Sequence, residues 1–114
     1  MSQESFTGPL VLSDATGEVT QESYYENGLL EKKMKIFLNK KLYMETEYFH
    51  GKKHGNQYFY DEAGNVVLRQ HYQNNVLHGL SYFYDNKKPV EKTLYRNGQM
   101  IRKLRYGDTP KFIT

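Results

Sequence analysis

The sequence predicts an all-β protein, an elongated antiparallel meander of repeated β-hairpins that form a single sheet of about nine strands. Three observations support this fold class. The 114 residues include 11 tyrosines and 6 phenylalanines, and aromatic residues favour the pleated surface of a sheet. A tyrosine-led motif recurs, with turn residues about every 11 to 12 positions, the spacing of an all-β meander. No segment has the apolar period of an amphipathic helix.

The repeated motif is Tyr-x-x-Gly, in which one copy has asparagine in place of the glycine. Its tyrosines are 23, 24 and 23 residues apart. Two units continue alike, with His-Gly and then Tyr-Phe-Tyr-Asp, over residues 54–61 and 78–85. We therefore expect one domain over residues 1–114, with a degenerate unit before the first full one and frayed tails at 1–6 and 109–114. The units start near Tyr25, Tyr48, Tyr72 and Tyr95.

Turn chemistry sets the spacing of the strands. Asn-Gly pairs at 27–28 and 97–98 are strong signals of a type I′ turn, which needs positive φ at both central residues. His50-Gly51 and Asn74-Asn75 fill the same positions. Halfway between these turns lie two Asn-Lys pairs and the Asp61–Gly64 segment, which predicts a three-residue loop closed by a left-handed glycine. The predicted structural turn and bulge residues are Asn27, Gly28, Gly51, Gly55, Gly64, Gly79, Asn97 and Gly98.

These turns divide the chain into nine expected strands. Pro9 and Pro110 lie near the ends, where a strand loses no ladder bond, and Pro89 is expected at a strand start or a bulge. The expected strands, in order, are 9–13, 18–26, 29–38, 41–49, 52–61, 65–73, 76–85, 88–96 and 99–107.

Counting outward from each turn predicts the pairing register. About the loop at 61–64, Tyr60 is expected opposite Val66, Phe59 opposite Val67 and Tyr58 opposite Leu68. About the turn at 74–75, Tyr72 is expected opposite Leu77, and His71 opposite His78.

With these pairings, two steps across the sheet advance the sequence by 23 residues, whereas the repeat there is 24 residues. A slip of one residue would place Tyr58 and Tyr82 on opposite faces, because side chains alternate along a strand. We therefore expect a β-bulge to absorb one residue in each unit, with Gly55 and Gly79 as the bulge residues.

Each of two units supplies an aromatic triplet, at 58–60 and 82–84. The outer tyrosines are expected on one face and the middle phenylalanine on the other. Cross-strand aromatic pairs of this kind contribute roughly 0.2–1 kcal/mol each. Since no helix is expected, the rings are expected to take the place of a helix-covered interior.

The pattern Tyr-x-x-Gly, His-Gly, Tyr-Phe-Tyr-Asp resembles MORN repeats, and more closely the bacterial MORN-variant group of YwqK-type antitoxin-like proteins. The resemblance covers residues 8–107 and is clearest over 45–100. This sequence departs from the pattern in having no tryptophan and in having Lys32 where other units have Gly55 and Gly79. The resemblance implies a binding role: an antitoxin or immunity protein with a protein partner, or more broadly a contact surface for protein or lipid.

The residues themselves give little support for catalysis or metal binding. The chain has no cysteine, no Gly-x-Ser-x-Gly segment and no glycine-rich phosphate loop. His54 and His78 recur in one slot of the repeat, which favours a structural role. Glu45 and Glu47 alternate on one strand and are expected to form a solvated face. We expect no catalytic residue, no metal and no cofactor.

Charge is distributed unevenly along the chain. Residues 1–62 hold 7 basic and 10 acidic residues, whereas residues 63–114 hold 9 and 3. The expected function is a non-enzymatic, cytoplasmic protein–protein interaction module of antitoxin or immunity type, whose partner could be a cognate toxin. The alternative is a peripheral module that contacts anionic lipid, while nucleic acid is disfavoured and no homo-oligomer is assigned. The candidate partner-binding residues are Tyr58, Tyr60, Tyr82, Tyr84, Arg96, Arg102 and Arg105.

Overall fold

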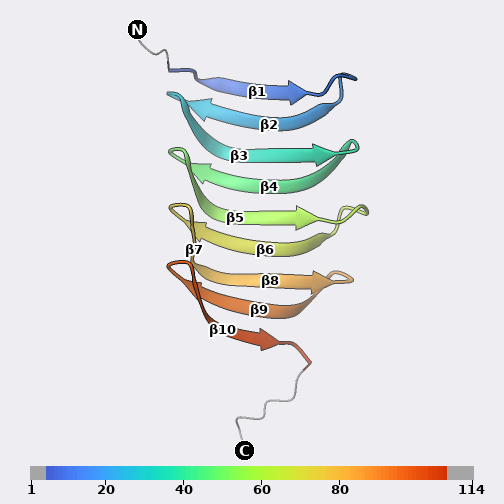
Figure 1. Ribbon diagram of the computed structural model, residues 1–114, viewed down its shortest axis with the longest axis vertical. Helices are drawn as coiled ribbons and strands as arrows, with labels where there is room; N and C mark the ends of the chain where they lie inside the picture. The colour runs from blue at the N-terminus through green and yellow to red at the C-terminus, as the bar shows by residue number, and fades with distance from the viewer. Residues whose placement is uncertain (1–4, 108–114) are drawn as a thin grey trace, which may run out of the picture.

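The computed structural model describes residues 5–107 and confirms the all-β fold class. Ten strands form one open antiparallel sheet in chain order, and β7 pairs only with β6 (Figure 1). No helix occurs in this part of the chain, so none there is long and apolar enough to cross a membrane. The strands are β1 (Gly8–Ser13), β2 (Val19–Glu26), β3 (Leu29–Leu38), β4 (Lys41–Phe49), β5 (Lys52–Tyr60), β6 (Val66–Gln73), β7 (Val76–Leu77), β8 (Gly79–Asp85), β9 (Lys88–Arg96) and β10 (Gln99–Arg105).

The strand count differs from nine for one reason. The strand expected over 76–85 is divided at His78 into β7 and β8, next to the left-handed Gly79. The expected tails at 1–4 and 109–114 lie outside the described residues. The expectation that Phe6 is frayed is wrong, because its carbonyl accepts a hydrogen bond from Gly28 N at 2.8 Å.

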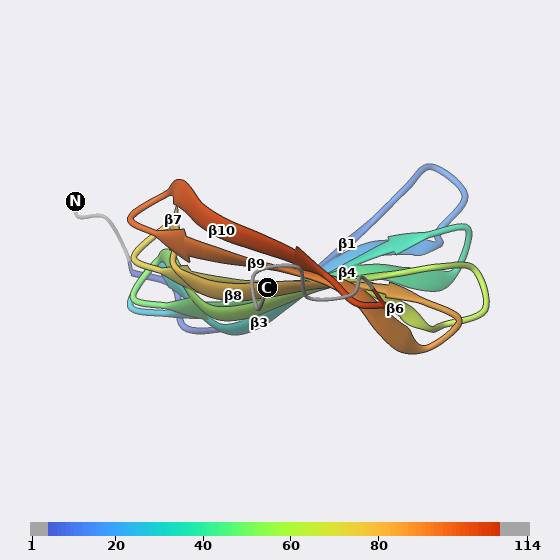
Figure 2. The same ribbon diagram turned by 90° about the horizontal axis from the view of Figure 1, so that it is seen from below.

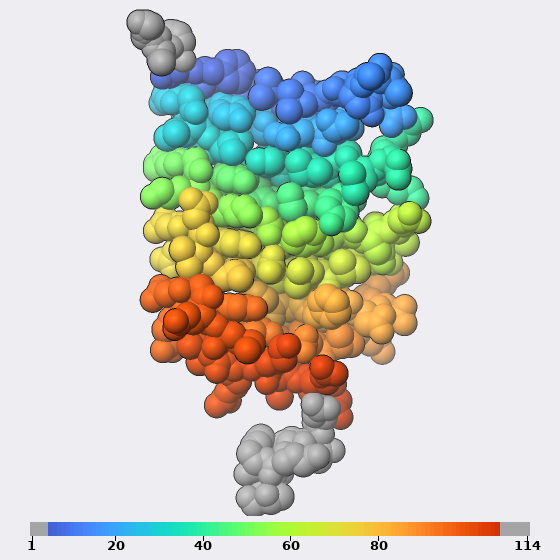
Figure 3. Space-filling model, viewed as in Figure 1, coloured from blue at the N-terminus to red at the C-terminus, as the bar shows by residue number. Residues whose placement is uncertain are grey.

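The molecule is a single twisted layer measuring 65 × 32 × 16 Å. Viewed from below, β1 and β10 cross at an angle (Figure 2), because the twist between neighbouring strands accumulates across the sheet. The space-filling view shows the strands packed into continuous tiers in chain order (Figure 3). Within residues 5–107 no second layer of structure covers either face.

The predicted turns are confirmed. Both central residues have positive φ in the six two-residue turns, as in Asn27 (52°) and Gly28 (81°). The Asp61–Gly64 loop closes as predicted: Gly64 has φ 89°, and Gly64 N donates to Asp61 O at 3.0 Å. The Asp61 carboxylate also accepts from Ala63 N and Asn65 N, which is a reason for aspartate at the start of this loop.

The predicted bulges at Gly55 and Gly79 are confirmed, but they are larger than expected. Between the pairs Thr46–Gln57 and Tyr48–Lys53, one residue of β4 faces three residues of β5, among them Gly55. Two residues are therefore absorbed there, and the same number is absorbed around Gly79.

A second bulge, at the opposite end of each unit, shifts the pairing register by one residue in the other direction. Tyr60 pairs with Val66 as predicted, but Phe59 then pairs with Leu68, so Val67 is the extra residue. The predicted pairs Phe59–Val67 and Tyr58–Leu68 are wrong for this reason, and Tyr58 faces Arg69 instead. The net gain of one residue restores the 24-residue advance, and Tyr58 and Tyr82 share one ladder through Arg69.

The tyrosine of each motif lies opposite a residue with positive φ, which belongs to a bulge in every pair but the first. The pairs are Gly8–Tyr25, Lys32–Tyr48, Gly55–Tyr72 and Gly79–Tyr95. Lys32 has φ 65°, so it adopts the conformation that glycine supplies in the other units. Burial, followed by the neighbouring Tyr25 and Tyr72, raises the pKa of Tyr48.

Successive units are also linked through their turns. Gly51 N donates to Leu30 O and Gly98 N to Leu77 O, each at 2.8 Å, across one full unit. The residue before the left-handed position adds a second link: Glu31 accepts from His50 N (2.8 Å), and His78 Nδ1 lies 3.2 Å from Asn97 N. The structural role expected for His78 is thereby confirmed.

The buried centre of the sheet is polar. Within residues 5–107 no apolar side chain is buried, whereas Thr46 (1% exposed) and Gln57 (3%) are. Thr46 Oγ1 donates to Gln57 Oε1 at 2.8 Å, and Gln57 Nε2 donates to Gln70 Oε1 at 3.0 Å. These polar side chains form a row between two rows of larger ones, the motif tyrosines and an apolar row, which together exclude water from them.

The apolar row marks what we call the phenyl face. Its members pair directly across five strands and are Ile36, Met44, Phe59, Leu68 and Phe83. The row is only partly covered, and Phe83 is 48% exposed. The expectation that the rings replace a covered interior is therefore wrong: they line an open surface beside the polar row.

Candidate functional site

The opposite face carries the outer tyrosines of the triplets, and we call it the Tyr–Arg face. Directly opposed residues along its middle row share this face because paired side chains lie on the same side. Basic residues and tyrosines alternate in one part of this row: Arg69 lies between Tyr58 and Tyr82, and Lys92 follows them. In chain order its members are Glu22, Lys35, Glu45, Tyr58, Arg69, Tyr82, Lys92 and Leu104.

The centre of this face is a ladder of Tyr58, Arg69 and Tyr82. The Arg69 guanidinium lies over the Tyr82 ring, with its carbon 4.5 Å from the ring centroid, in the range of a cation–π contact. Each ladder tyrosine has a second tyrosine two residues along: Tyr58 and Tyr60 have centroids 6.4 Å apart, as do Tyr82 and Tyr84. The strands thus present four half-buried phenols on one surface.

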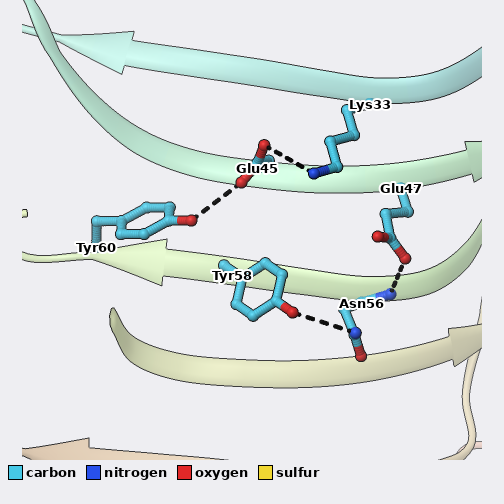
Figure 4. Close-up of polar contacts among 6 residues, drawn as sticks. All are labelled: Lys33, Glu45, Glu47, Asn56, Tyr58 and Tyr60. Atoms are coloured by element: carbon cyan, nitrogen blue, oxygen red, sulfur yellow. Dashed lines mark hydrogen bonds and ion pairs between the residues drawn. The ribbon is translucent and has the colours of Figure 1, made fainter. Parts of the chain in front are cut away.

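Hydrogen bonds hold the β5 side of this surface in place (Figure 4). The Tyr60 hydroxyl donates to Glu45 Oε1 at 3.0 Å, and Lys33 Nζ lies 3.6 Å from Glu45 Oε2. The Tyr58 hydroxyl accepts from Asn56 Nδ2 at 3.2 Å. The phenols are therefore oriented before any partner arrives, which lowers the entropy lost on binding.

The contact with Glu45 perturbs the titration of Tyr60. Burial, followed by the Glu45 hydrogen bond and negative charge, raises the pKa of Tyr60 from 10.0 to about 12. The folded state favours the neutral phenol, so the stability that Tyr60 contributes is complete below pH 10.0 and is lost as the pH rises through about 12.

We expect an alkaline titration followed by tyrosinate absorbance to contain one late step near pH 12, and we expect that step to disappear in Tyr60→Phe. Glu45→Gln is the control, because it removes the negative charge and keeps the phenol. Tyr60 should then titrate earlier. A late step that persists in Tyr60→Phe would contradict the assignment.

A basic groove adjoins the ladder over β8–β10. It encloses about 630 Å³ and is lined mainly by Leu80, Leu94 and Leu104 with Lys92 and Arg102. Within residues 5–107, Arg69, Lys92 and Arg102 have no carboxylate within ion-pair distance. This end of the Tyr–Arg face therefore carries positive charge beside exposed leucines.

A larger groove of about 710 Å³ lies over β1–β5 on the same face. Its charges are mixed, with Glu22 and Glu47 beside Lys33 and Lys35. These oppose one another in the sheet, as in the pairs Lys33–Glu47 and Lys35–Glu45. Lys33 and Lys35 are thus each opposed by a carboxylate, and the third lysine of the lining, Lys32, lies over the Tyr24 ring, which makes this groove the weaker candidate although it is the larger hollow.

The structure brings most of the predicted site residues together. Tyr58, Tyr60, Tyr82 and Tyr84 share the Tyr–Arg face, as do Arg96 and Arg102 by the alternation of β9 and by pairing with Leu94. Arg105 does not: it pairs with Glu91 on the phenyl face, and its Nη2 lies 3.7 Å from Glu91 Oε2.

Arg69 and Lys92 were missed by the sequence argument. The predicted register placed Leu68 opposite Tyr58, and only the extra Val67 brings Arg69 into the ladder. The repeat length alone does not find Arg69, because Leu68 between Tyr58 and Tyr82 would give the same cross-strand advance of 24 residues. Compared with protein-family models, curated proteins and solved structures, the chain matches none.

Proposed function

We propose that this protein is a non-enzymatic module that binds another protein through the Tyr–Arg face, as an antitoxin or immunity protein does. The observation that carries the proposal is the ladder Tyr58–Arg69–Tyr82, held in place on an uncovered surface. Tyrosine and arginine dominate the binding energy of protein interfaces. The resemblance of the repeat to MORN-variant antitoxins agrees with this role, and a cysteine-free chain suits the cytoplasm.

The charge of the site favours an acidic partner. Arg69, Lys92 and Arg102 have no carboxylate within 4.0 Å in the described part of the chain, so their charge is available to a partner. Opposite charge across an interface speeds association and selects among partners. Leu80, Leu94 and Leu104 add apolar contact beside these cations.

The test compares two variants of one strand. Tyr82→Ala with Tyr84→Ala removes two phenols from the Tyr–Arg face, and Phe83→Ala between them removes a more exposed ring from the phenyl face. A partner captured by the wild type should lose at least about tenfold in affinity for the double variant and bind Phe83→Ala as before. Thermal unfolding of each variant checks that the fold is retained. Equal affinity of wild type and double variant would contradict the proposal.

A second candidate function is contact with an anionic lipid surface, favoured by the same leucines and cations over β8–β10. Co-sedimentation with phosphatidylserine vesicles at low and high salt distinguishes the two. Salt-sensitive sedimentation that is abolished by Arg102→Glu would support lipid contact. Absence of sedimentation at low salt would exclude it.

A further inference from the structure

The two edges of the sheet differ in whether they can accept another strand. Just outside the two ends of β1, Gly28 N donates to Phe6 O and Asp14 N donates to Glu18 O, so the even-numbered residues between them turn their backbone groups toward β2. Odd-numbered residues therefore point outward, and one of them is Pro9, which has no N–H to donate. This edge is blocked at one of its outward positions.

The edge at β10 has no such block. Tyr106 N donates to Val90 O at 2.8 Å, so Tyr106 and, by alternation, Leu104 and Arg102 turn toward β9. Lys103 and Arg105 then turn their N–H and C=O groups away from the sheet. Every residue of β10 is exposed, and within residues 5–107 no strand pairs with its outer side.

The charges at β10 select the kind of strand that fits. Lys103 Nζ and Arg105 Nη2 lie 3.4 and 3.7 Å from the same carboxylate oxygen of Glu91, so two cations share one anion. Arg102 on the other face has no carboxylate within 4.0 Å among residues 5–107. A second copy of β10 would bring like charges together, which opposes pairing.

The sheet itself contains the same kind of pairing. Strand β3 carries Lys33 and Lys35, and the antiparallel strand β4 places Glu47 and Glu45 directly opposite them. Strand β10 runs in the same direction as β3, and it lacks the antiparallel strand that would lie next in the series.

We propose that β10 accepts an additional antiparallel strand from an extended, acidic segment of a protein partner. The inference rests on the proposed function in taking the partner to be a protein, and it adds a second contact along the edge of the sheet. The strand would bond to Lys103 and Arg105 through its backbone and place carboxylates beside their side chains, with apolar residues beside Leu104.

The probe is a short synthetic peptide of alternating glutamate and valine, and the same peptide with glutamine in place of glutamate is its control. We expect the acidic peptide to slow amide hydrogen exchange at Lys103 and Arg105 by about tenfold or more, because new hydrogen bonds protect these amides. The glutamine peptide should protect them far less.

Two variants and one control locate the contact. Lys103→Pro removes an outward N–H and should abolish peptide binding, whereas Val11→Pro makes the matching change on β1 and should not. Arg105→Glu keeps the N–H, reverses the charge and should also abolish binding, which covers a loss of folding in Lys103→Pro. Tyr82→Ala with Tyr84→Ala should leave peptide binding intact, so the edge and the face are tested separately.

Peptide binding without protection of these two amides would overturn the proposal, as would equal binding of the glutamine peptide or no binding at all. Protection that appears without peptide and grows with protein concentration would identify a second copy as the occupant, and would also overturn it. Each of these outcomes leaves the proposed function of the Tyr–Arg face standing.

Discussion

Gly55→Ala is expected to lower the free energy of unfolding by about 3 kcal/mol, because two costs add. The backbone at this position has φ 113°, a conformation that side chains rarely adopt. An added Cβ would also lie against the Glu47 side chain, whose Cβ is 3.2 Å away, and would displace the carboxylate that accepts from Asn56 N at 2.8 Å. Chemical denaturation measures the change.

Gly64→Ala is the matched control. Gly64 also has positive φ (89°), but an added Cβ there meets no atom within 4 Å. We expect only the backbone strain, about 1 kcal/mol. Similar losses in the two variants would show that the bulge at Gly55 is not held against Glu47, which would contradict the register described above.

Gln57→Ala is expected to cost about 2–4 kcal/mol, although the residue is polar. Its amide accepts from Thr46 and donates to Gln70, and the site is almost fully buried. Truncation leaves Thr46 Oγ1, which is also buried, without its hydrogen-bond partner. Equilibrium unfolding in urea gives the change in stability.

Gln73→Ala provides the comparison, because Gln73 is an exposed residue on the neighbouring strand β6. We expect a change within about 0.5 kcal/mol. If Gln57→Ala were as mild as Gln73→Ala, the sheet would owe its stability to the aromatic rows, and the polar row would be incidental.

The turns could be predicted because their signals are local. Asn27-Gly28 and Asp61–Gly64 each fix a backbone conformation within a few residues, and the strands between them follow from turn spacing. The bulges at Gly55 and Gly79 were also predictable, because the repeat and the ladder advance differ by one residue.

The second bulge was not predictable in this way. Val67 has no local signal that distinguishes it from Val66. The sequence gives only the net register shift of one residue in each unit, which is the shift of two at the glycine bulge less the shift of one at the second bulge. The predicted site lacked Arg69 for this reason, because Arg69 pairs with Tyr58 only through that bulge. Arg105 lies on the phenyl face, apart from the other predicted residues, for a related reason: clustering in sequence does not say on which face a strand residue lies.

The polar centre was not foreseen either. Thr46 and Gln57 look like solvent-facing strand residues when strands are taken singly. Their burial depends on the rows beside them, one of motif tyrosines and one of apolar residues, which only the assembled sheet brings together.

The central claim is that one uncovered, elongated sheet leaves both of its faces available for contact. Small-angle X-ray scattering of the dilute protein tests it most directly. The account predicts a radius of gyration near the 17.5 Å of the structure. A value of about 13 Å, which is ordinary for a compact domain of this length, would mean that the sheet folds over on itself and would contradict the account.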